Sequence, residues 1–344
     1  MNNVDYVKLN NDFVLNTYNR YPIALVKGKG AYLWDADGKK YLDFLSGLAV
    51  TSFGHSNPVI TKTIKKQAAT LIHTSNIFHV PNQIKTAELL SSISFPGKTF
   101  FCNSGTEANE AAIKFATLHG NSIKNGKNIL LSAFDSFHGR TTGSIKLTGQ
   151  KKYQEGFEPL IDRVRYFTRN DVSLLEKVFD DKVCAIFLEG VQGESGVYPL
   201  TQAFVLKVKE LCEKYNALLI FDEVQTGIGR TGKYFSYQHY DVTPDIITMA
   251  KALANGFPIG AMHVQDKWKD IFKPGHHAAT FGGNPFCTAI AVTVLELLKQ
   301  EGTLKKINEI SELLLKRLEE LKSDFNNLIT EIRCIGLMIG MQIP

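Results

Sequence analysis

The stretch that decides the fold is Asp-Ile-Ile-Thr-Met-Ala-Lys-Ala-Leu-Ala-Asn-Gly, residues 245–256. Its first half has the length and the β-branched content of a buried strand, and small residues and a glycine follow Lys251. The lysine therefore lies where a buried strand gives way to a turn. Because desolvation disfavours a charged ammonium, its pKa falls there, and the neutral amine can act as a nucleophile and form a Schiff base. The alternative is a lysine whose ammonium reaches water from the strand end.

Outward from this stretch, short apolar strands alternate with amphipathic helices along most of the chain. The predicted strands are 99–102, 128–132, 184–188, 217–221, 246–249 and 260–264, and the predicted helices are 58–71, 82–93, 106–118, 171–179, 201–215, 284–299 and 302–323. Strands that are apolar on both sides indicate an α/β fold with a mainly parallel sheet covered on both faces. Ligands of such sheets bind beyond the carboxyl ends of the strands.

The two chain ends differ from this middle part. Residues 9–20 predict a short helix, and three short strands at 23–26, 31–34 and 41–44 predict a small β-meander. We expect residues 1–50 to form the N-terminal part of a small domain, 51–300 the large domain, and 301–344 the start of the C-terminal part of the small domain. Because the chain stops at Pro344, directly after a predicted strand at 337–341, we expect the rest of that small domain to be missing.

The composition is that of an ordinary globular protein, with 344 residues of which 44% are hydrophobic and 21% charged. The net charge of +5 comes without a dense block of Lys and Arg, so a nucleic-acid partner is not expected. Five cysteines without a Cys-x-x-Cys pair indicate a reducing compartment, and no resident metal is expected. The N-terminus lacks a signal-peptide pattern and no apolar run has transmembrane length, so we expect a cytoplasmic protein without a membrane partner.

Polar residues cluster in loops after the predicted strands. Ser104, Gly105 and Thr106 lie between a strand and a helix, where small residues and free N–H groups favour an anion such as a phosphate. An ordinary helix cap is the alternative there. In the next loop, Phe137 could cover a planar ring and Arg140 could clamp a carboxylate, although a surface loop with a structural arginine fits as well.

Carboxylates follow two more strands. Glu189 and Glu194 stand in a glycine-rich loop after residues 184–188, as functional groups or as solvated loop charges. Asp222 follows the apolar strand 217–221, where burial of its carboxylate requires a cationic partner. A protonated heterocyclic nitrogen would be such a partner, and a magnesium ion held by Asp222 and Glu223 is the alternative. Together with the anion cradle and Lys251, these groups match the needs of pyridoxal phosphate, a cofactor that acts as an electron sink.

The sequence also resembles the class III (ω-type) aminotransferases. The resemblance is carried by residues 32–44, 104–110, 137–140, 222–227 and 280–285, together with Lys251, and it runs through nearly the whole chain. It implies the fold type I architecture of pyridoxal-phosphate enzymes, which is a mainly parallel sheet of the seven-stranded type flanked by helices, with a smaller α+β domain. The stretch 222–230, with Lys251 at its expected distance, is specific to this class.

The resemblance implies roles for the cofactor-binding residues. Lys251 would bind pyridoxal phosphate covalently and then move the substrate proton. Asp222 would pair with the ring nitrogen, Gln225 would bond near the ring hydroxyl and Phe137 would stack on the ring. The phosphate would be held by Ser104, Gly105 and Thr106 through backbone and hydroxyl groups. Thr280 would reach the cofactor of the other subunit in a homodimer with active sites at the interface.

The substrate-binding residues implied by the resemblance are Arg140, Glu189, Glu194 and Tyr18. Arg140 would bind a substrate carboxylate, and Glu194 would gate a second arginine that family members carry further along the chain. Within the family, the resemblance is nearest to members that act on N-acetylornithine. These move its terminal amine to 2-oxoglutarate and form a semialdehyde and glutamate in arginine biosynthesis.

Several alternatives stay open at the level of the sequence. The amino donor could instead be ornithine, succinyl-ornithine, succinyl-diaminopimelate or 4-aminobutyrate. An intramolecular aminomutase would use the same fold without 2-oxoglutarate, and a non-catalytic homologue would serve only in binding or assembly. The filled cofactor positions argue against the last of these.

Overall fold

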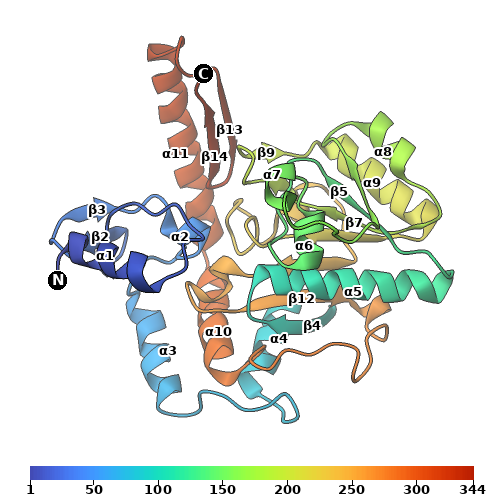
Figure 1. The fold of residues 1–344 in the computed structure, drawn as a ribbon, viewed down its shortest axis with the longest axis horizontal. Coiled ribbons are helices and arrows are strands. Elements are labelled where there is room, and N and C mark those ends of the chain that lie inside the picture. The colour runs from blue at the N-terminus through green and yellow to red at the C-terminus, as the bar shows by residue number, and fades with distance from the viewer.

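A seven-stranded sheet lies at the centre of the computed structural model, which describes residues 1–344 (Figure 1). In spatial order its strands are β4 (Gly97–Cys102), β12 (Gly260–Gln265), β11 (Ile246–Met249), β10 (Leu218–Asp222), β7 (Val183–Leu188), β5 (Ile129–Ala133) and β6 (Val164–Phe167). Only β12 runs antiparallel to its neighbours, β4 and β11. The expected mainly parallel sheet is therefore confirmed.

Successive residues of a strand point to opposite sides of the sheet, so strands that are apolar throughout give the sheet two apolar faces. Helices cover both of them. On one face, Leu218 and Ile220 of β10 pack with α5 (Gly105–Ile123). On the other face, Leu219 and Phe221 join a larger core. The helices of that second face are α4 (Pro81–Ile93), α9 (Gln202–Tyr215) and α10 (Pro285–Lys299), and α8 (Val172–Val178) lies beside β6. The two apolar faces hold the strand ends in fixed positions.

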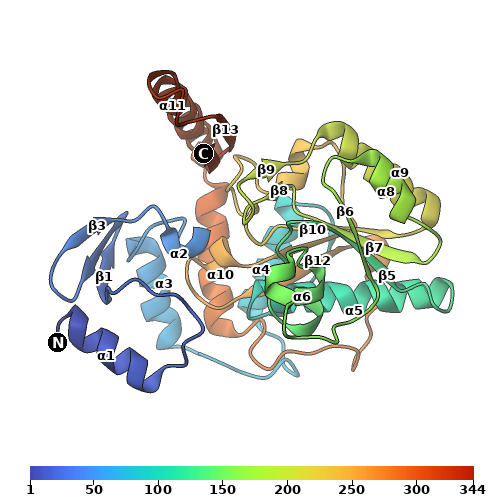
Figure 2. The same ribbon diagram turned by 45° about the horizontal axis from the view of Figure 1, so that its top comes forward.

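The N-terminal part forms a separate small sheet at one side of the molecule (Figure 2). Its antiparallel strands are β1 (Leu25–Lys29), β2 (Tyr32–Asp35) and β3 (Lys40–Leu42), which agrees with the expected meander. The helix expected at 9–20 is wrong in its bounds, since α1 spans Asn3–Phe13. The reason is a capping box in which Asn2 and Asp5 exchange hydrogen bonds and start the helix earlier than the apolar pattern suggests.

The C-terminal part begins with α11 (Thr303–Asp324), followed by a hairpin of β13 (Glu331–Ile335) and β14 (Met338–Gln342) beside it (Figure 1). The two chain ends meet, because residues 44–46, Ala49 and residues 337–339 line one small cavity of about 200 Å³. This contact accords with a small domain built from both ends, whose boundaries stay a prediction. None of the helices has the length and apolarity that a membrane crossing would require.

The shorter elements connect these parts. They are α2 (Ser46–Ala49), α3 (Pro58–Ala68), α6 (Thr142–Leu147), α7 (Lys151–Gln154), β8 (Val191–Gln192), β9 (Tyr198–Pro199), and the 3-10 helices η1 (Ser236–His239), η2 (Lys251–Ala254) and η3 (Asp266–Trp268). The helix α3 packs against α10, which links the N-terminal part to the central sheet.

Candidate active site

A cavity of about 410 Å³ opens at the carboxyl ends of β10 and β11. Its lining contains every residue that the sequence singled out for the site except Thr280 and Tyr18, namely Ser104, Gly105, Thr106, Phe137, Arg140, Glu189, Glu194, Asp222, Gln225 and Lys251. The position agrees with the general rule for parallel sheets. The fold therefore brings the segments that follow five strands, β4, β5, β7, β10 and β11, to one place.

Lys251 enters this cavity at the start of η2, immediately after β11. Burial lowers the pKa of its ammonium below the ordinary value, against the opposing charge of Glu194, and Arg230 adds a further lowering. Its backbone has φ +42°, a left-handed conformation that is uncommon for a side chain with a Cβ. Such strain persists where the surrounding fold dictates it, and it gathers at functional sites.

The carboxylate of Asp222 ends β10 and is 4% exposed. Its Oδ2 accepts hydrogen bonds from Asn109 Nδ2 at 2.8 Å and from His138 Nδ1 at 2.7 Å. Its Oδ1 accepts one bond, from the backbone N–H of Val224 at 3.0 Å. Because a carboxylate oxygen accepts two or more bonds, Oδ1 keeps acceptor capacity for a cationic group in the cavity.

His138 makes the site around Asp222 more polar than the sequence suggested. Burial alone lowers the pKa of this imidazole, but the hydrogen bond and charge of Asp222, with Glu189 beyond it, outweigh burial and raise the pKa. The other ring nitrogen, Nε2, is buried without a hydrogen-bond partner. The buried carboxylate of Asp222 therefore has a histidine partner on the side of Oδ2.

The start of α5 lies at the cavity, where the sequence predicts an anion cradle. The backbone N–H groups of Gly105 and Thr106 belong to the first turn, which has no helical acceptors for them, and both residues line the cavity. A Cβ on Gly105 would lie 2.7 Å from Val224 Cγ1, so a larger residue would crowd this wall of the cavity. These groups fit a phosphate at a helix N-terminus.

The two hydroxyls expected to help with the phosphate are engaged elsewhere. Ser104 Oγ donates to Glu107 Oε2 at 2.8 Å and caps α5. Thr141 Oγ1 donates to Glu110 at 2.5 Å, so the 2.8 Å bond between Thr106 Oγ1 and Thr141 Oγ1 takes the hydrogen of Thr106. Ser104 thus caps α5, as the alternative interpretation expected, and the role of Ser104 and Thr106 toward a phosphate stays a prediction.

The carboxylates of Asp222 and Glu223 do not converge. Glu223 is buried, and its carboxylate has its own set of donors. These are the hydroxyl of Thr226, the backbone N–H of Tyr237, and the backbone N–H and hydroxyl of Ser236. The nearest partners of Asp222 are neutral or cationic donors instead. This arrangement offers no pair of oxygens that face one point, as a magnesium site would need.

Arg140 lies at the exposed mouth of the cavity. Its guanidinium carbon is 3.8 Å from the ring centroid of Tyr153 and 5.6 Å from that of Phe137. Cation–π contacts of this kind orient the planar guanidinium while its N–H groups stay available for a carboxylate. Tyr153 was not singled out from the sequence, because it lies in α7, outside every loop that follows a strand.

Glu189 lies behind Phe137 and accepts a hydrogen bond from its backbone N–H at 3.1 Å. Burial is the main cause that raises the pKa of this carboxyl to about 7, although His138 opposes the change. The folded protein therefore holds a proton here that the unfolded chain has lost above pH 4.5.

A pH-dependent difference in stability is expected for Glu189→Gln. Since the folded pKa is the higher one, the native carboxyl stabilises the fold below about pH 4.5, and this stability is lost as pH rises through about 7. Without added cofactor, the free energy of unfolding of the variant, relative to that of the native protein, should increase by about 3 kcal/mol as the pH rises from about 5 to about 8. Urea unfolding at both pH values measures this difference, and parallel pH profiles would contradict it.

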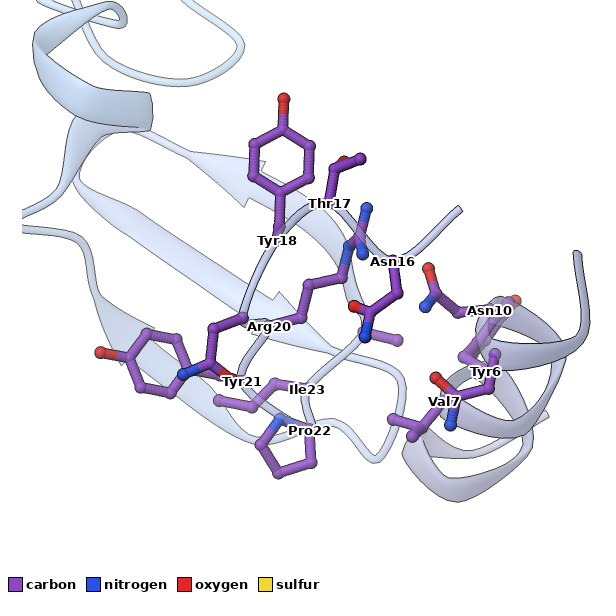
Figure 3. A pocket seen from close by; sticks show the side chains of 13 residues that line it. Tyr6, Val7, Asn10, Asn16, Thr17, Tyr18, Arg20, Tyr21, Pro22 and Ile23 are labelled. Atoms are coloured by element: carbon purple, nitrogen blue, oxygen red, sulfur yellow. The ribbon is translucent and has the colours of Figure 1, made fainter. Parts of the chain in front are cut away.

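Two predicted residues lie elsewhere in this chain. Tyr18 is 70% exposed and lines a separate cavity of about 740 Å³ between α1 and residues 16–24 (Figure 3). Arg20 lies over its ring, with 5.1 Å between the guanidinium carbon and the ring centroid. Thr280 is exposed in the loop before α10. The structure thus does not place Tyr18 near Lys251, and the role of Thr280 toward a second subunit stays a prediction.

The fold and this cavity define the class of the protein, which is that of the fold type I pyridoxal-phosphate enzymes. Comparison with known proteins narrows the class: the chain belongs to the family described as aminotransferase class-III, which matches residues 14–344.

Three similar proteins illustrate this relation. The acetylornithine aminotransferase of Caldanaerobacter subterraneus subsp. tengcongensis is 47% identical over 332 residues, which cover 96% of this chain and 84% of that protein. The solved ornithine aminotransferase of Toxoplasma gondii ME49 superposes with a TM-score of 0.94 at 30% identity, over 100% of this chain and 83% of that one. The taurine:2-oxoglutarate aminotransferase of Bifidobacterium kashiwanohense, solved with pyridoxal phosphate and glutamate, gives a TM-score of 0.93 at 26% identity with the same coverage.

Proposed function

We propose that the protein is a transaminase that transfers the terminal amine of N-acetylornithine to 2-oxoglutarate, with pyridoxal phosphate as cofactor. The products would be N-acetylglutamate semialdehyde and glutamate. The observation that carries the chemistry is a half-buried lysine of lowered pKa in one cavity with a hydrogen-bonded aspartate. Support for the donor comes from the 47% identity to a protein named for acetylornithine.

The residues present fit the cofactor. The first-turn N–H groups of Gly105 and Thr106 would hold its phosphate, Asp222 Oδ1 would accept from its ring nitrogen, and Phe137 would cover its ring. Pyridoxal phosphate, when bound, supplies a reactive aldehyde and a ring that withdraws electrons from the substrate carbon. Gln225 lines the same cavity and would bond near the ring hydroxyl.

The remaining groups act on the substrate. Lys251 would be both the nucleophile and the base that moves a proton at the carbon bearing the amine, and its lowered pKa favours both tasks near neutral pH. Arg140 would bind a substrate carboxylate with two hydrogen bonds. Glu194 is exposed in the cavity wall, where its charge would select among side chains of the donor.

We further propose that the working unit is a homodimer. Thr280 is exposed in one subunit and lines no part of that subunit's own cavity, so its phosphate-binding role requires a second copy. Sedimentation of the holoenzyme should therefore give twice the chain mass of 38.3 kDa.

Ornithine is a second candidate donor. Its free α-ammonium could pair with the exposed carboxylate of Glu194, and the protein superposes closely on an ornithine aminotransferase. The identity to that protein is 30%, against 47% to the acetylornithine enzyme, which favours the acetylated donor.

The absorbance of the protein with bound pyridoxal phosphate tests both candidates. N-acetylornithine is expected to bleach the near-visible band within one turnover, and 2-oxoglutarate should then restore it. Bleaching by ornithine but not by N-acetylornithine would replace the donor. A protein that binds pyridoxal phosphate and responds to no amine would contradict the proposed reaction.

A further inference from the structure

A buried amide joins the elements that carry the site. Asn109, in the second turn of α5, is 1% exposed. Its Nδ2 donates to Asp222 Oδ2 and to the backbone carbonyl of His138, both at 2.8 Å. Its Oδ1 accepts from Thr248 Oγ1, also at 2.8 Å, and Thr248 is fully buried in β11, three residues before Lys251.

This set of contacts leaves the amide one orientation. If the amide were reversed, its oxygen would face the carboxylate of Asp222 and the carbonyl of His138, and acceptors would oppose acceptors without a hydrogen between them. The hydroxyl of Thr248 must then donate, because Asn109 Oδ1 carries no hydrogen. The direction of each bond is therefore fixed from Thr248 through Asn109 to Asp222.

The bond to Asn109 also decides which carboxylate oxygen is free. Asp222 Oδ2 receives two donors, Asn109 and His138, whereas Oδ1 receives one backbone N–H. Rotation of the carboxylate away from this orientation would break both bonds to Oδ2 at once and leave two buried donors without their acceptor. Asp222 lines the cavity, and the bonds to Oδ2 thus fix the position of Oδ1, the oxygen that keeps acceptor capacity.

We propose that Asn109 and Thr248 are positioning residues that hold Asp222 for the cofactor. This inference rests on the proposed function, since it assigns to Asp222 the ring nitrogen of pyridoxal phosphate. Thr248 does not line the cavity, and Asn109 lines it in contact with Asp222. Their effect passes through the carboxylate.

Two substitutions test the chain of bonds. Asn109→Ala removes a donor to a charged group and should weaken the affinity for pyridoxal phosphate about 10- to 100-fold. Thr248→Val keeps the shape, removes only the hydroxyl, and should weaken it about 3- to 10-fold. Thr86→Val is the matched control, because Thr86 is another fully buried threonine whose hydroxyl donates to a backbone carbonyl, in α4. It should leave the affinity unchanged.

The decisive comparison is made in the Asp222→Ala background. If both residues act through Asp222, adding Thr248→Val there should change the affinity for pyridoxal phosphate by less than about twofold. If Thr248→Val weakened the affinity for pyridoxal phosphate as much in the Asp222→Ala background as in the native protein, Thr248 would have a general structural role. That result would overturn the inference. An affinity within about twofold of the native protein for both single variants would overturn it as well.

The same titrations separate this inference from the proposed function. Failure of the native protein to bind pyridoxal phosphate would contradict the proposed function and, with it, the inference. Tight binding by the native protein, with unaffected variants, would contradict the inference alone. Thermal unfolding of each variant shows whether it is folded, and Thr248→Val remains a valid test if Asn109→Ala does not fold.

Discussion

Lys251→Ala is expected to abolish transamination, with a loss of about ten-thousandfold or more. The substitution removes the only amine in the cavity that can both attack a carbonyl and move a proton at the substrate carbon. The near-visible absorbance of the covalently bound cofactor should disappear, while noncovalent binding at the start of α5 remains. Stopped-flow measurement of both half-reactions would quantify the loss, and retained turnover would contradict the assigned role.

Substitution of Lys251 should raise the free energy of unfolding, although it abolishes activity. Burial lowers the pKa of the Lys251 ammonium, and the backbone of this residue is left-handed. Both the buried amine and the backbone strain therefore cost the native protein folding free energy. Lys251→Gly should be more stable than Lys251→Ala by about 1 kcal/mol, because glycine adopts positive φ without a Cβ penalty. Denaturant unfolding of the variants without cofactor tests this order. An exposed lysine such as Lys305 provides a control, for which alanine should leave activity unchanged.

The fold was predictable where local pattern and burial agree. The strand before Lys251 has the bounds expected from its β-branched run, Ile246–Met249, because it is buried on both sides. The strand β6 (Val164–Phe167) was not predicted, since Arg165 and Tyr166 interrupt its apolar residues at the edge of the sheet. Edge strands need only part of their surface to be apolar, so their sequence resembles a loop.

The loops that form the site could be predicted from the sequence, whereas the hydrogen bonds among its residues could not. Lys251 and Asp222 could be found because they follow apolar strands, and strand ends converge in a parallel sheet. Asn109 and Thr248 gave no signal of their own, since one lies within a helix and the other within a strand. Their partnership depends on the contact of α5 with β11, which no local pattern reports.

Asp222→Ala should lower the rate of transamination by about two to four orders of magnitude, which corresponds to a loss of about 3–5 kcal/mol for a broken buried ion pair. The variant loses the acceptor for two buried donors, Asn109 Nδ2 and His138 Nδ1. The pKa of His138 should fall, because Asp222 is what outweighs burial of the imidazole. The fold itself should also lose stability, so a second substitution is needed to separate structure from function.

Asp222→Asn provides this separation. The amide has the shape of the carboxylate, and its oxygen would turn toward Asn109 and His138, which both donate. Its NH₂ group would then take the place of Oδ1, lose the hydrogen bond from the backbone N–H of Val224, and present hydrogens to the cavity, where the native oxygen accepts. The folded protein should therefore persist, whereas a protonated ring nitrogen would meet a donor and lose its partner. A fall in activity close to that of Asp222→Ala, with an unfolding midpoint nearer to the native one, is the expected result. Near-native activity of Asp222→Asn would show that the charge of Asp222 is not required.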